Sequence, residues 1–103
     1  MHNRRGDNTT MVTKIEVEQY AAATNAAVIR LPGRKFPGVV LQGDSLKVLP
    51  DCAEDVARLA EHASPDLKEL IQELRDHLQG YLRVYEDTLK THGQALPYVS
   101  RVG

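Results

Sequence analysis

One long helix limits what this chain can fold into. Ser64 and Pro65 mark its start, because serine can cap a first turn and proline is accepted at the first helical position. Gly93 marks its end, since glycine commonly follows the last helical residue. A helix over residues 65–92 would be about 42 Å long, more than the ~30 Å width of a small domain. A chain of 103 residues forms one such domain, so part of the helix must project from it, bend at Gly80 or meet a second copy.

Apolar residues recur along this helix at spacings of three and four, which places them on one side. The stripe consists of Leu67, Leu70, Ile71, Leu74, Leu78, Tyr81, Leu82, Tyr85 and Leu89. A sheet of three short strands extends only about 20 Å along each strand and cannot cover a stripe of this length. We therefore expect a homodimer through residues 67–89, because two-fold pairing is the commonest way to cover a surplus apolar face. The main alternative is that residues 96–99 of the same chain cover a part of the stripe.

The amino-terminal half is predicted to form strands. Residues 12–20 alternate between apolar and polar side chains, and residues 26–31 and 39–42 are short runs rich in β-formers. Two Pro-Gly pairs within residues 32–38 mark a loop between the last two strands. Strands followed by helices predict an α+β fold, with a short antiparallel sheet of about three strands, then two helices, the second long. We expect the helices to cover one face of the sheet.

The first helix is expected over residues 51–63, after a separate helical turn at residues 45–49. Pro50 separates the two, because proline lacks the N–H that an interior helical position needs. Asp51 and Glu54 are spaced as in a capping box and would begin the helix.

Composition and charge exclude several classes of protein. The chain has 13 basic and 14 acidic residues, which excludes a histone-like coat for a polyanion, and its single cysteine forbids an internal disulfide. No apolar run approaches the roughly 18 residues of a membrane span. Residues 1–11 are polar apart from two methionines, unlike a secretory signal, and are predicted to be a disordered leader. We expect a cytoplasmic protein with a single α+β domain over residues 12–103 and no membrane contact.

Basic residues gather in the predicted hairpin. Residues 26–47 carry four basic groups and one acidic group, whereas residues 51–93 carry ten acidic and five basic groups. Arg30, Arg34 and Lys35 lie close to Phe36 at the tip of the loop. This pattern predicts a surface that binds a protein partner. Nucleic acid is an alternative, but it is disfavoured because only one aromatic accompanies the cations and the chain has no basic excess.

A possible nucleophile follows the last strand. The sequence Gly43-Asp44-Ser45-Leu46 resembles the Gly-Asp-Ser-Leu block of a family of serine hydrolases, and the resemblance implies Ser45 as the nucleophile. Such a serine needs a histidine base and an acid that orients it. The family's Asp-x-x-His and its oxyanion blocks are missing from this chain. We therefore expect no catalytic residue here and expect Asp44 or Ser45 to cap the following helical turn.

No metal site or cofactor is expected either. Glu73 and His77 are spaced as ligands on one helical face, but no second pair of ligands accompanies them.

Residues 28–46, VIRLPGRKFPGVVLQGDSL, resemble the signature of a small family of bacterial proteins with no assigned reaction. By analogy with other small bacterial proteins, the resemblance suggests an immunity- or antitoxin-like protein whose partner is a protein such as a toxin. The candidate binding residues are therefore Arg30, Arg34, Lys35, Phe36, Gln42, Asp44 and Ser45.

Overall fold

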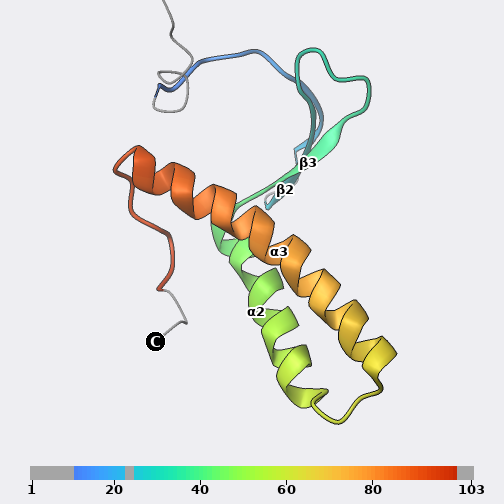
Figure 1. Ribbon diagram of the computed structural model, residues 1–103. Coiled ribbons are helices and arrows are strands. Elements are labelled where there is room, and N and C mark those ends of the chain that lie inside the picture. The colour runs from blue at the N-terminus through green and yellow to red at the C-terminus, as the bar shows by residue number, and fades with distance from the viewer. Residues whose placement is uncertain (1–10, 23–24, 100–103) are drawn as a thin grey trace, which may run out of the picture.

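The computed structural model describes residues 11–22 and 25–99, in which a small sheet precedes two helices (Figure 1). The elements in chain order are β1 (Glu18–Ala22), β2 (Ala26–Arg30), β3 (Gly38–Leu41), α2 (Gly43–Leu59) and α3 (Pro65–Thr91). Both strand pairs are antiparallel, and the sheet order is β1-β2-β3. The predicted α+β fold is thus confirmed. The leader predicted for residues 1–11 lies outside the described residues, apart from Met11.

β1 begins later than the alternating pattern predicted. Residues 12–17 belong to no strand, and Val12 and Ile15 are exposed. The pairing of Glu18 with Arg30 explains the difference. Residues 12–17 would have to pair beyond Arg30, where the chain turns at Pro32 and leaves no strand for them.

A tight turn closes β2 against β3. The Arg34 N–H donates a hydrogen bond to the Leu31 carbonyl at 3.1 Å, and Gly33 has φ of +79°. A type II turn requires a positive φ at its third position, which glycine adopts easily, and often has proline at its second. Pro32 and Gly33 therefore fix the position of the loop that carries Arg34.

α2 is one continuous helix, so the break predicted at Pro50 is wrong. The Pro50 side chain is fully buried on the same side of α2 as Gly43, Lys47 and Ala53. Its packing offsets the roughly 3 kcal/mol that an interior proline costs a helix. The capping box predicted at Asp51 is also wrong, because this carboxylate lies inside the helix and binds the Lys47 ammonium at 2.6 Å.

α3 runs back along α2, and the two helices form a hairpin (Figure 1). The Ser64 hydroxyl caps α3 by accepting a hydrogen bond from the Leu67 N–H at 3.2 Å, as its sequence predicted. Leu82 is buried in the contact with α2. Between the helices, the Arg75 guanidinium donates to both carboxylate oxygens of Glu54, at 2.9 and 3.0 Å.

The segment that follows α3 returns along one side of this helical hairpin (Figure 1). The Tyr98 hydroxyl donates a hydrogen bond to Glu86 at 2.8 Å, and the Tyr98 ring lies 5.4 Å from the Lys47 ammonium. Burial of Tyr98 and the neighbouring Glu86 carboxylate both raise the pKa of its phenol. Lys47 itself is buried, between Asp51 and this ring.

The expected cover over the sheet is not formed. Within the described chain, extensive contacts between elements join only α2 to α3 and neighbouring strands to each other. β1 and β3 are exposed along their whole length, and β2 is half-buried. The reason lies at Gln42, the single residue between β3 and α2, which is too short a connection for α2 to fold back over the strands. α2 therefore leads away from the sheet (Figure 1).

Neither described helix has a stretch that is both long and apolar enough to cross a lipid bilayer.

Candidate functional site on the β2–β3 hairpin

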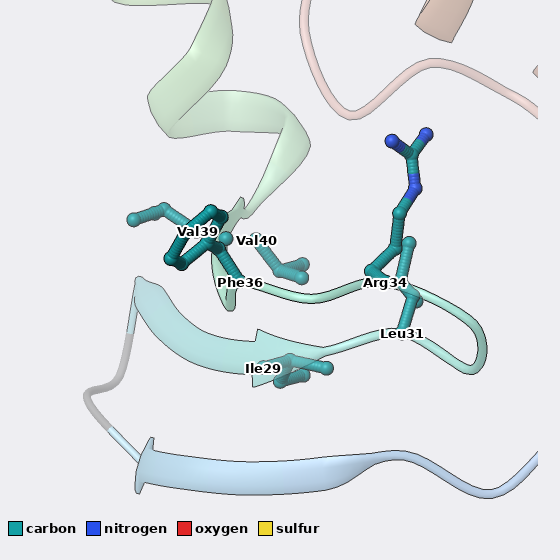
Figure 2. A pocket seen from close by; sticks show the side chains of 7 residues that line it. Ile29, Leu31, Arg34, Phe36, Val39 and Val40 are labelled. Atoms are coloured by element: carbon teal, nitrogen blue, oxygen red, sulfur yellow. The ribbon is translucent and has the colours of Figure 1, made fainter.

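The β2–β3 hairpin carries an exposed apolar depression of about 250 Å³ (Figure 2). We call it the hairpin surface, and its lining residues are Ile29, Leu31, Arg34, Phe36, Gly38, Val39 and Val40. Phe36 and Val39 lie toward one end of the depression, and the Arg34 side chain rises at the other (Figure 2). The exposed fractions of Phe36 and Val39 are 74% and 63%. Phe36 is therefore available to a partner.

Among the strands that the structure describes, none pairs with the outer edge of β3. The Gln42 N–H donates to the Asn25 carbonyl at 3.2 Å, and the pairing continues with Val40 opposite Ala27. Hydrogen-bonded and non-hydrogen-bonded pairs alternate in antiparallel strands. The backbone groups of Val39 and Leu41 consequently point away from β2. They present N–H and C=O groups that a further strand could pair with.

The three cations of the hairpin differ in their surroundings. Arg30 forms an ion pair with Glu18 of β1, which raises the pKa of the guanidinium, and also donates to the Arg34 carbonyl at 3.0 Å. The Lys35 ammonium lies 5.4 Å from the centre of the Phe36 ring. Among the described residues, neither the Arg34 nor the Lys35 side chain has a recorded ion pair with a carboxylate. Arg30 thus links β1 to the loop after β2, whereas Arg34 and Lys35 can bind an acidic group of a partner.

The other candidate residues lie at the opposite end of β3, about 13 Å away along its four residues. Gln42 is the N-cap of α2 but makes no side-chain capping bond. Asp44 and Ser45 lie in the first turn, where Asp44 Oδ1 accepts a hydrogen bond from the Ser45 N–H at 2.8 Å. The prediction that Asp44 or Ser45 caps this helix is therefore wrong, because the N-cap is Gln42 and both residues lie inside the helix. The structure does not bring these residues together with Arg34, Lys35 and Phe36.

A serine nucleophile and a metal site each need particular neighbouring side chains. Over residues 11–22 and 25–99, the structure records no hydrogen bond from the Ser45 hydroxyl to a histidine. The same part of the chain contains no group of three or more histidine, cysteine or acidic side chains placed to hold a metal ion.

Sequence reasoning missed the apolar part of the hairpin surface. Ile29, Leu31, Val39 and Val40 were visible as β-rich runs, and these runs were interpreted as core strands covered by helices. The signal that could have exposed them is the single residue Gln42 between β3 and α2, which leaves no room for such a cover.

Comparison with known proteins identifies a family but no function. A model of a family of unknown function (DUF6959) matches residues 12–98, which include every described strand and helix. No curated protein and no solved structure shows significant similarity to the chain. The match covers most of the 103 residues. The chain therefore belongs to the DUF6959 family, a family of unknown function.

Proposed function

We propose that this protein is a non-enzymatic protein-binding module that works through the hairpin surface. An extended segment of the partner adds to the open edge of β3, and acidic side chains of that segment reach Arg34 and Lys35. The proposal rests on three features of one hairpin: the unpaired edge of β3, the exposed side chains of Phe36 and Val39, and two cations that form no ion pair within residues 11–22 and 25–99.

When a peptide strand adds to the edge of a sheet, its main chain and its side chains make different contributions to binding. Main-chain hydrogen bonds along the edge provide affinity, and side chains that alternate along the added strand are selected by the surface they meet. Here Val39 and Phe36 would receive apolar side chains, and Arg34 would receive a carboxylate at the end of the depression. Pro32 and the type II turn hold the loop in place, which lowers the conformational entropy lost on binding.

An immunity- or antitoxin-like role is one form of this function. The partner would then be a toxin that offers an acidic segment able to form a strand.

The direct test selects ligands for the purified full chain from a displayed library of random peptides of about a dozen residues. We expect enriched peptides that combine β-forming apolar residues with Asp or Glu. Arg34→Glu with Lys35→Glu should slow their association, and the difference should fade as salt rises. The matched control, Arg83→Glu with Lys90→Glu, changes the net charge equally on α3 and should leave association unchanged.

A second variant tests strand addition itself. Val39→Pro removes an N–H that points to the open edge, whereas Val39→Ala keeps this N–H and shortens the side chain. If a peptide strand pairs with β3, Val39→Pro should weaken binding roughly tenfold relative to Val39→Ala. Equal binding by the two variants, or selected peptides without acidic and β-forming residues, would contradict the proposal.

A further inference from the structure

α3 carries two apolar seams, not the single stripe that the sequence predicted. The first seam faces α2 and is buried or half-buried; it comprises Ile71, Leu78, Leu82, Tyr85 and Leu89. The second seam, which we call the free seam, is exposed and comprises Leu67, Leu70, Leu74, His77, Tyr81 and Val84. The dimer interface expected over residues 67–89 therefore cannot include Tyr85 and Leu89, because these two side chains already pack within their own chain.

The free seam has the spacing of a coiled coil. Its residues follow each other at intervals of three, four, three, four and three, which is the a/d pattern of a heptad repeat. Tyr81 and Val84 have exposed fractions of 65% and 69%. His77 at the middle of the seam is a polar residue of the kind that can fix the register of such a contact. A seam with this period is suited to a partner that is itself a helix.

α2 widens this apolar face. By helical spacing, Leu49 and Val56 lie on the flank of α2 that continues the free seam, and both are exposed. The ion pair of Arg75 with Glu54 lies on the opposite flank of the helical hairpin. Tyr98 lies on that same opposite flank through its contacts with Glu86 and Lys47, so this described residue of the carboxyl-terminal segment lies away from the free seam.

We propose that the free seam, with Leu49 and Val56, is the interface with a second copy of this chain, so that two helical hairpins form a four-helix bundle. The apolar members of this face have exposed fractions of 41–69%, so they could bury on the order of several hundred Å² per protomer, the scale of the ~800 Å² per partner in a specific interface. A second copy brings a face of the same length and the same heptad period, which a two-fold contact requires.

Sedimentation of the full chain tests the proposal. At about 50 µM we expect a species of twice the 11.5 kDa of one chain. Leu74→Glu with Tyr81→Glu should raise the dissociation constant roughly 30-fold or more, while helical content stays unchanged. The matched control is Val48→Glu with Leu59→Glu, because these exposed apolar residues lie on the side of α2 turned away from α3. The control should remain a dimer.

A disulfide cross-link tests the same interface independently, in case the variant Leu74→Glu with Tyr81→Glu does not fold. In a Cys52→Ser background, His77→Cys places a thiol near the midpoint of the seam, where it meets its own copy whether the helices run parallel or antiparallel. Mild oxidation should link most of this variant into covalent dimers. Arg83→Cys, on the opposite side of α3, should stay largely unlinked. A monomeric wild-type protein, a control pair that dissociates as readily as the seam pair, or equal cross-linking at positions 77 and 83 would overturn the proposal.

Discussion

The contact between Gly43 and Tyr85 allows the packing of α2 on α3 to be tested by the addition of a single methyl group. A Cβ atom built on Gly43 would overlap the hydroxyl and the ring of Tyr85. Gly43 is the first residue of α2 and is buried beneath this side chain. Gly43→Ala must therefore push Tyr85 away or move the start of α2 off α3.

Two opposing contributions determine how much Gly43→Ala changes the free energy of unfolding. Overpacking of this kind costs about 1–3 kcal/mol. Alanine is favoured over glycine within a helix by about 0.8–1 kcal/mol, and this gain is smaller at a first helical residue. The free energy of unfolding should therefore fall by about 1–2 kcal/mol, which lowers the melting temperature by roughly 4–16 °C in a domain of this size. Gly80→Ala is the matched control, since nothing lies within 4 Å of its added Cβ, and it should raise stability by the helical term alone.

Urea unfolding followed by circular dichroism at one fixed protein concentration measures all the variants. Tyr85→Leu in the Gly43→Ala background should be less destabilising than the sum of the two single changes, because it removes the overlapping ring. The reasoning is refuted if Gly43→Ala is as stable as the wild type, or if the two changes add.

Two further predictions concern the helix cap and the carboxyl-terminal segment. Ser64→Ala should lower the free energy of unfolding by about 0.5–2 kcal/mol, because it removes the cap of α3. Ser45→Ala, inside α2, should change this free energy by less than about 0.5 kcal/mol. Equal losses for the two variants in urea titrations would contradict the assignment of Ser64 as the cap. Because the pKa of Tyr98 is raised on folding, its contribution is complete below the ordinary tyrosine pKa of about 10 and is lost as the pH rises above it. The melting temperature of the wild type should therefore fall more steeply above about pH 10 than that of Tyr98→Phe, and identical alkaline profiles would rule out the buried phenol as the cause.

Local signals predicted most of the elements correctly. The Ser64-Pro65 start of α3 and the Pro-Gly turn after β2 depend on the conformations that a few neighbouring residues can adopt, so sequence alone was sufficient. Local signals could not predict that α2 continues through Pro50, because a helix tolerates this proline only when its side chain packs against residues far away in the chain. The same holds for residues 12–17, whose alternating pattern fits a strand but with which none of the described strands pairs.

The candidate site was predicted only in part. The cations of the loop were visible as a cluster, but the ion pair that occupies Arg30 requires the register of β1 against β2. Gln42, Asp44 and Ser45 are near the loop in sequence, yet an extended β3 separates them from it. The two seams of α3 share one helical period, and only the burial of individual side chains distinguishes them.

The one-residue connection at Gln42 gives the molecule a fixed geometry. Its N–H is bound within the sheet, by Asn25, and its carbonyl accepts the Leu46 N–H at 2.8 Å in the first turn of α2, so the connection contains no slack. A pair of chains joined through α3 would hold two hairpin surfaces at a set separation and orientation. A partner with two suitably spaced segments would bind the second one at a high effective concentration, and its avidity could exceed single-site affinity by roughly 10²–10⁴. A partner with the wrong spacing would gain nothing, so the rigid connection would select partners by their geometry as well as by their sequence.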